Sequence, residues 1–236
     1  MFTLTGPVLV TGTDTGVGKT IVTAAVAVAA AAAGLKVAVV KVAQTGITTG
    51  EESDASVVAR LAEPASIRTL AAYPDPLAPL AAARVCGEPP LAAMAAHLGV
   101  RHVGRHHDLT LVEGAGGLLV PMGEGGWTAA DLAVSLRATA VVVARAGLGT
   151  LNHTALTLEA LRRRDIPAVV VIGAWPNEPE LVHRTNLRDL EGDLVGAVPQ
   201  GAGAMEAHVF RREAPHWLSG PLYGHFDPMA FRSRSR

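Results

Sequence analysis

A glycine-rich turn near the N-terminus carries the residues best suited to hold phosphate groups. Residues 8–23 read V-L-V-T-G-T-D-T-G-V-G-K-T-I-V-T, so a β-branched run leads into a turn, and the turn opens into a long apolar segment of helical character. Gly18, Lys19 and Thr20 match the second half of the phosphate-loop pattern G-x-x-x-x-G-K-[ST]. Gly12 stands one residue earlier than the first glycine of that pattern.

The residue types in this turn predict a binding site for a nucleoside triphosphate. Gly16 and Gly18 have no Cβ, so their backbone amides can turn toward an anion. The helix that begins near Gly18 directs its unpaired N–H groups and its positive dipole end to the same point. Lys19 adds a full positive charge, and the hydroxyl of Thr20 can ligate magnesium.

Further chemistry-bearing residues follow two apolar runs that read as strands. Lys41 lies at the end of the run Leu35–Val42, shortly before Thr45. Glu113 follows the run Asp108–Val112. Sites in open α/β sheets lie beyond the carboxyl ends of the strands, where the phosphate loop also lies. A glutamate there can supply the hard oxygen that a nucleotide-bound magnesium ion needs. Asp54 is a second candidate, although Ser53-Asp54 taken alone is better explained as a helix N-cap.

A second glycine-rich turn, G-L-G-T-L-N-H over residues 147–153, leads into a helix from about Asn152 to Arg164. Free amides at such a helix start can hold a carboxylate or a phosphate. Spacing alone is equally compatible with an ordinary capped helix.

The elements that must position these residues alternate between strand and helix along the whole chain, which predicts a single α/β domain with a mostly parallel sheet flanked by helices. We expect strands at Val8–Thr11, Leu35–Val42, Asp108–Val112, Ala138–Ala144, Pro167–Gly173 and Asp193–Val198. We expect helices at Ile21–Ala33, Asp54–Leu61, Pro90–Val100, Trp127–Leu136, Asn152–Arg164, Glu178–Leu190 and Gly203–Leu218.

Two segments lack such patterns. The proline-rich part of Glu63–Pro90 predicts an extended surface loop, because proline cannot pair within a central strand. Residues 223–236 show no periodicity and end R-S-R-S-R, so we expect a domain over 1–222 followed by a flexible tail.

Composition excludes several classes of partner. A net charge of −1 over 236 residues and a pI near 6.8 give no electrostatic reason to expect nucleic acid or an anionic membrane as a partner. The apolar run Ile21–Ala33 is shorter than the about 20 residues of a membrane span. The lone Cys86 cannot form an internal disulfide, so we expect a cytoplasmic protein. His97, His102, His106 and His107 lie among arginines, which favours a solvated helix end over a metal site.

The motifs together carry a specific resemblance. G-T-D-T-G-V-G-K-T, K-V-A-Q-T-G, S-D-A, V-E-G-A-G-G-L-L-V-P and G-L-G-T-L-N-H-T occur in this order. In order and spacing they resemble the dethiobiotin synthetase family over about Val8 to Gly201, and that family writes its loop with five residues between the glycines. The resemblance implies a phosphate-loop NTPase fold and a Mg²⁺-dependent ligase of biotin synthesis. Its substrates would be 7,8-diaminopelargonate, CO2 and ATP or another nucleoside triphosphate.

The resemblance also implies roles for individual residues. Lys41, Lys19 and Thr15 match catalytic positions, and Thr20, Asp54 and Glu113 match the magnesium ligands. Lys41 and Thr45 would contact the carbamate or the amines of the substrate. The positions that match the nucleotide-binding residues are Gly16, Val17, Gly18, Lys19, Thr20, Ile21, Asp54, Glu113, Gly114, Ala115, Gly116, Gly173, Ala174, Pro199, Gln200 and Gly201.

The family further implies a homodimer, because the substrate carboxylate meets a helix N-terminus of the other subunit. Gly149, Thr150, Leu151 and Asn152 match that segment. In the family the strand that corresponds to the run ending at Ile172 is followed by an asparagine that reads adenine. Here Gly173-Ala174-Trp175 follows, from which we expect relaxed base selectivity.

Other functions stay open at this point. The main alternative is a partition-type or metal-chaperone ATPase, although the extra lysine that such proteins carry near the front of the loop is replaced by Thr13-Asp14-Thr15. A glutamine-dependent amidoligase of the cobyrinic-acid type would need a glutaminase cysteine, which the context of Cys86 does not suit. A small-molecule kinase would need an arginine-bearing lid, and Arg162–Arg164 reads as a helix end.

Overall fold

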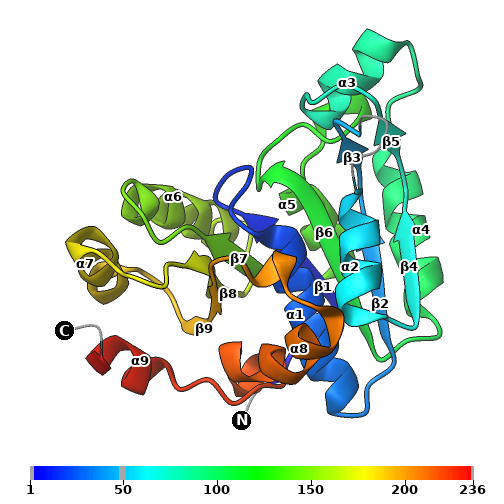
Figure 1. Cartoon of the computed structure of the whole chain (residues 1–236). Coiled ribbons are helices and arrows are strands. Elements are labelled where there is room, and N and C mark those ends of the chain that lie inside the picture. Colours follow the sequence, from blue (N-terminus) through cyan, green and yellow to red (C-terminus); the bar gives the residue numbers. More distant parts are fainter. Residues whose placement is uncertain (1–2, 48–51, 235–236) are drawn as a thin grey trace.

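The fold is a parallel sheet of seven strands with helices on both faces (Figure 1). The structure is a computed structural model that describes residues 3–47 and 52–234. The strand order is β4-β2-β6-β1-β7-β8-β9, and every pairing in this sheet is parallel. A separate pair, β3 and β5, lies beyond the carboxyl end of β2. The expectation of an α/β domain with a parallel sheet is confirmed.

The strands are β1 (Gly6–Gly12), β2 (Val37–Lys41), β3 (Gln44–Thr45), β4 (Ser66–Thr69), β5 (Ala72–Tyr73), β6 (Leu109–Gly117), β7 (Thr139–Ala144), β8 (Ala168–Trp175) and β9 (Leu194–Pro199). The α-helices are α1 (Lys19–Ala32), α2 (Asp54–Ala62), α3 (Pro79–Cys86), α4 (Ala93–Gly104), α5 (Ala129–Leu136), α6 (Thr150–Arg162), α7 (Leu181–Asp189), α8 (Ala207–Glu213) and α9 (Pro228–Arg234).

The core consists of two hydrophobic layers, one on each face of the sheet. Successive strand residues point to opposite faces, so Leu9 belongs to one layer and Val8 and Val10 belong to the other. The first layer packs under α4 to α7, and the second packs under α1, α2 and α8. Strands covered on both faces are apolar along their whole length, which is why these strands could be recognised as continuous apolar runs.

The segment Glu63–Pro90 is more ordered than predicted. It forms the edge strand β4, the short strand β5 and the helix α3. The expectation of an extended loop over the proline-rich part is therefore wrong where α3 forms, and β4 lies before that part. Pro79 occupies the first turn of α3, where a missing N–H costs nothing, and the hydroxyl of the buried Tyr73 accepts the amide of Leu91 at 3.2 Å.

The C-terminal segment also differs from the expectation of a tail without regular structure. It contains the helix α9, which lies beside β9 at the edge of the sheet (Figure 1). The hydroxyl of Tyr223 donates to the carbonyl of Leu4. Residues 235 and 236 of the predicted tail lie outside the described residues.

Within the described ranges, no helix has both the length and the apolar character that crossing a bilayer requires.

Candidate active site

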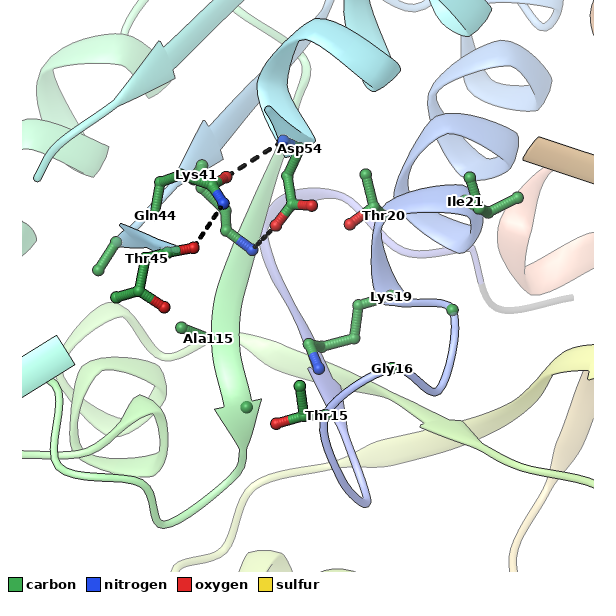
Figure 2. Close-up of a pocket in the computed structure, with 13 residues that line it drawn as sticks. Thr15, Gly16, Lys19, Thr20, Ile21, Lys41, Gln44, Thr45, Asp54 and Ala115 are labelled. Carbon is green, nitrogen blue, oxygen red and sulfur yellow. Dashed lines mark hydrogen bonds and ion pairs between the residues drawn. The ribbon is translucent and has the colours of Figure 1, made fainter. Parts of the chain in front are cut away.

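A cavity of about 410 Å³ lies where the carboxyl ends of β1, β2 and β6 meet the start of α1 (Figure 2). It brings together residues that are far apart in the sequence and that the motifs had singled out. Its lining consists of Thr15, Gly16, Gly18, Lys19, Thr20, Ile21, Lys41, Ala43, Gln44, Thr45, Asp54, Ala115 and Gly116.

The phosphate loop joins β1 to α1 and is tightly folded on itself. A Cβ at Gly12 would lie 2.7 Å from the Val17 side chain and 2.8 Å from the Asp14 carbonyl, so only glycine fits there. Gly18 precedes α1 with φ of 98°, which also favours glycine. The side chain of Lys19 folds back so that its Nζ donates to the Asp14 carbonyl at 2.9 Å. The five residues between Gly12 and Gly18, one more than in the usual pattern, thus form a compact turn that the Lys19 side chain holds at the Asp14 carbonyl.

Lys41 stands opposite this loop at the end of β2, and its ammonium contacts two carboxylates. Its Nζ lies 2.7 Å from Oε1 of Glu113 and 2.5 Å from Oδ2 of Asp54, and it donates to the Gly114 carbonyl at 3.1 Å. Strand pairing explains part of this arrangement, because Lys41 of β2 lies in register with Glu113 of β6. Thr20 donates its hydroxyl proton to the same Oε1 at 2.9 Å.

The two lysines experience different electrostatic surroundings. Burial lowers the pKa of Lys19 below its ordinary value, and the positive charge of Lys41 acts in the same direction. Burial would also lower the pKa of Lys41, but Glu113 and Asp54 outweigh it and hold that pKa above its ordinary value. Lys41 therefore keeps its proton and its positive charge at neutral pH.

The oxygen atoms gathered here fit a magnesium ion. The hydroxyl of Thr20 and the carboxylates of Asp54 and Glu113 are hard ligands, and Lys41 shows that the carboxylate pair already attracts a cation. Asp54 also begins α2, whose N-cap is Ser53. Asp54 is thus the first residue of a helix and also part of the site, and Ser53 provides the N-cap.

Two residues of the cavity were missed by the sequence reasoning. Ala43 and Gln44 follow Lys41, and Oε1 of Gln44 accepts the backbone amide of Asp54 at 3.1 Å (Figure 2). This bond ties the start of α2 to β3. Their place just beyond a strand end is the signal that could have identified them.

The end of β8 corrects one expectation. The strand runs from Ala168 to Trp175, two residues beyond the predicted end at Gly173, and the first asparagine after it is Asn177. Gly173 is buried within the strand, where a Cβ would lie 2.0 Å from the Val17 carbonyl of the phosphate loop. Gly173 therefore allows close packing between strand and loop. The argument for relaxed base selectivity, which took Gly173 to stand in the place of the base-reading asparagine, loses its basis.

The other predicted nucleotide-binding residues gather around this strand end. Pro199 lies in register with Trp175, and the Gln200 amide donates to the Trp175 carbonyl at 2.7 Å. Ala174, Gln200 and Gly201 are exposed. The ends of β8 and β9 thus form one hydrogen-bonded unit beside the phosphate loop.

The second glycine-rich turn does not belong to the cavity of its own chain. Residues 149–152 are absent from the lining of that cavity. Gly149 precedes α6 with φ of 89°, the side chain of Thr150 is buried, and Asn152 is exposed. The first amides of α6 have no partner within the helix, as at any helix start.

Two of the histidines near α4 have individual hydrogen-bond partners. Nδ1 of His97 lies 3.1 Å from the Ser135 hydroxyl, and Nδ1 of His107 lies 2.7 Å from the Val103 carbonyl. Among the described residues, no group of three histidine, cysteine or acidic side chains is placed to hold a metal ion.

Solved structures resemble this fold at low sequence identity. A ParA family ATPase from Chlorobium tepidum superposes with a TM-score of 0.56 at 11% identity, covering 93% of this chain and 96% of that protein. The MinC:MinD cell division protein complex of Aquifex aeolicus gives a TM-score of 0.52 at 15% identity, covering 89% of this chain and 86% of the other. These similarities concern the fold, which is that of phosphate-loop NTPases.

Sequence comparison is more specific. The family described as "AAA domain" matches residues 7–207. The ATP-dependent dethiobiotin synthetase BioD of Streptomyces coelicolor is 51% identical over 235 residues, which cover 97% of this chain and 98% of the relative. BioD of Rhodococcus jostii is 52% identical over 215 residues, which cover 89% of this chain and 93% of the relative. Identity of this degree over nearly the full length, together with the cavity described above, shows that the chain belongs to the family of ATP-dependent dethiobiotin synthetases.

Proposed function

We propose that this chain closes the cyclic urea of dethiobiotin on 7,8-diaminopelargonate, using CO2 and the γ-phosphate of ATP. One amine of the substrate adds to CO2 and releases a proton, which gives a carbamate. A carbamate oxygen attacks the γ-phosphorus and ADP leaves, which gives a carbamic–phosphoric anhydride. The second amine then attacks the carbonyl carbon, and inorganic phosphate leaves as the ring closes.

The phosphate loop would hold the triphosphate. Its residues line the cavity beside the start of α1, and the buried ammonium of Lys19 would neutralise phosphate charge. Thr20, Asp54 and Glu113 would hold Mg²⁺, which when bound offsets the negative charge of the phosphate oxygens. Thr15 lines the cavity next to Lys19 and would contact the phosphates (Figure 2).

Lys41 would act on the reacting groups. Its ammonium lies in the cavity opposite the phosphate loop and stays protonated. A fixed cation there stabilises the charge that spreads over the carbamate and the γ-phosphate as the phosphoryl group transfers. Thr45, on the same side of the cavity, would hydrogen-bond the carbamate or an amine of the substrate (Figure 2).

The base of the nucleotide would lie at the ends of β8 and β9. Ala174 and the segment Pro199–Gly201 flank this position, and Asn177 is exposed just beyond β8. An asparagine amide both donates and accepts hydrogen bonds, as the edge of adenine does. We assign the base-reading role to Asn177, which lies four residues after Gly173, the residue that the sequence reasoning matched to the family's asparagine.

The substrate carboxylate would be held by a second copy of the chain. Residues 149–152 form a helix start that suits a carboxylate but does not reach the cavity of the same chain. A homodimer that places α6 of one subunit over the cavity of the other would complete the site. The aliphatic part of the substrate would then span the two subunits.

The observation that carries the proposal is the position of Lys41. A protonated lysine faces a phosphate loop across one cavity, in a chain half identical to named dethiobiotin synthetases. A regulatory ATPase of the ParA or MinD kind is not favoured, because those structures share the fold at only 11–15% identity.

The lone Cys86 supports a cytoplasmic location.

The test is a direct assay with product identification. The purified chain is incubated with 7,8-diaminopelargonate, bicarbonate, Mg²⁺ and each of ATP, CTP, GTP and UTP, and dethiobiotin is detected by its mass. We expect dethiobiotin and one phosphate per ring closed. Triphosphate hydrolysis that proceeds equally without the diamine, and without dethiobiotin, would contradict the proposal and favour a regulatory ATPase.

A further inference from the structure

The C-terminal helix α9 is a short helix with a defined start. The side chain of Asp227 accepts the amides of Met229 and Ala230 at 2.9 and 3.0 Å, and Pro228 occupies the first helical position. An aspartate cap followed by proline is a strong local helix start. The amide of Phe226, just before the cap, donates to the Leu218 carbonyl at 2.8 Å. The helix is therefore attached at its beginning to the body of the domain.

Aromatic packing attaches α9 to the end of β8. The ring of Phe231 meets the ring of Trp175 edge to face, with centroids 5.1 Å apart, and Phe226 packs on Phe231 at 5.0 Å. His183 of α7 contacts Trp175 from another position, at 6.2 Å. Trp175 is thus held between α7 and α9.

Arg232 provides a second attachment, to the end of α7. Its guanidinium donates to the carbonyls of Leu187 at 2.6 Å, Arg188 at 3.1 Å and Leu190 at 3.5 Å. The last carbonyls of a helix have no partner within it, and a cation there also complements the helix dipole. Phe231 and Arg232 of α9 therefore contact β8 and α7, respectively. These two elements border the loop that contains Asn177 (Figure 1).

The backbone of Trp175 leads directly to the nucleotide site. Its carbonyl accepts the Gln200 amide at 2.7 Å, and two residues earlier Gly173 packs against the Val17 carbonyl of the phosphate loop. The turn after β9 also approaches α1, because a Cβ at Gly203 would lie 2.7 Å from the Ile21 side chain that lines the cavity. The ends of β8 and β9 are thus joined at Trp175, and they pack against the phosphate loop and α1 through Gly173 and Gly203.

We propose that α9, through the contact of Phe231 with Trp175, positions the ends of β8 and β9 for the base of the nucleotide, so that the C-terminal helix sets nucleotide affinity and base preference. The inference rests on the proposed function in placing the base at these strand ends. Phe231 touches neither nucleotide nor diamine in this scheme and is a positioning residue. An aromatic contact of this kind limits the expected effect to about 3- to 10-fold in nucleotide affinity.

The test compares Phe231→Ala with Met229→Ala, a matched control on the same helix whose side chain is 77% exposed. ATP and GTP affinities are measured by isothermal titration without the diamine. We expect Phe231→Ala to weaken ATP binding about 3- to 10-fold and to narrow the preference for ATP over GTP, with kcat at saturating ATP and the KM for the diamine unchanged. Phe231→Tyr, which keeps the ring, should restore ATP affinity, and Met229→Ala should leave it unchanged.

Amide hydrogen exchange provides a readout that general destabilisation would not give. In Phe231→Ala the Gln200 amide, whose partner is the Trp175 carbonyl, should exchange faster, while amides of α1 and β1 keep their protection. Unchanged ATP affinity and unchanged exchange at Gln200 would overturn the inference. If Phe231→Ala does not fold, Arg232→Met decides the question by the same two measurements. Failure of the wild-type chain to form dethiobiotin would contradict the proposed function and not this inference, since binding is measured without the diamine.

Discussion

Lys41 and Glu113 form a buried ion pair at 2.7 Å, and the same carboxylate oxygen accepts the hydroxyl of Thr20 at 2.9 Å. The pair joins β2 to β6, and its lysine lines the cavity. One carboxylate thus links the lysine assigned to the carbamate with the threonine assigned to magnesium. The charge that we propose for catalysis also pairs with a buried carboxylate, so its effects on turnover and on stability must be measured separately.

Lys41→Met should reduce dethiobiotin formation about 100- to 1,000-fold, because it removes the fixed cation from the reacting groups. ATP affinity measured by titration should change less than about threefold, since the phosphate loop and Lys19 remain. The variant should also lose about 3 kcal/mol of unfolding free energy, because Glu113 stays buried without its cation.

The double variant Lys41→Met/Glu113→Gln separates stability from catalysis. Two neutral side chains leave no uncompensated buried charge, so the melting temperature should recover most of the loss while turnover stays low. Turnover of Lys41→Met within tenfold of wild type would remove Lys41 from the catalytic set.

Asn177→Ala should reduce the preference for ATP over GTP in kcat/KM about tenfold, because the amide that pairs with the base edge is lost. The side chain is exposed, so the melting temperature should stay the same. Glu178→Gln, at the exposed neighbouring position, is the matched control. An unaltered ratio of ATP to GTP in Asn177→Ala would exclude this residue from base recognition.

Asn152→Asp should raise the KM for the diamine about tenfold, because a new negative charge faces the substrate carboxylate. If the site spans two subunits, mixing Asn152→Asp with Lys41→Met should restore activity. In a mixed dimer, the Asn152→Asp subunit supplies a cavity with Lys41, and the Lys41→Met subunit supplies an unchanged α6. One of the two sites is therefore complete. Light scattering gives the oligomeric state, and activity of the mixture equal to the sum of the separate variants would contradict a shared site.

Gly173→Ala should weaken ATP binding and destabilise the fold, because its Cβ would lie 2.0 Å from the Val17 carbonyl and the phosphate loop would have to move. Forced overpacking of this kind costs about 1–3 kcal/mol or more. Gly147→Ala is the control, since no atom lies within 4 Å of the Cβ position there. Equal ATP affinity and melting temperature in the two variants would show that the contact at Gly173 is not required.

The sequence by itself determined the chemistry of the site. Glycines, the G-K-T triplet and polar residues after apolar strands are local signals, because phosphate binding needs bare amides and parallel strands end at one edge of the sheet. The phosphate loop, Lys41 and Glu113 were identified in this way, whereas Asp54 was favoured locally as a helix start and joined the site only through the family resemblance. The cavity contains or adjoins each of these residues.

Only the tertiary structure decided which of these groups touch and how β8 packs beside the phosphate loop. The Lys41–Glu113 pair depends on strand register, and the role of Gly173 depends on how closely β8 approaches the phosphate loop. The packing of α9 on Trp175 had no periodic signal, because a seven-residue helix is too short to show one. Contacts between distant segments follow from how the layers pack, and local preference carries no information about that geometry.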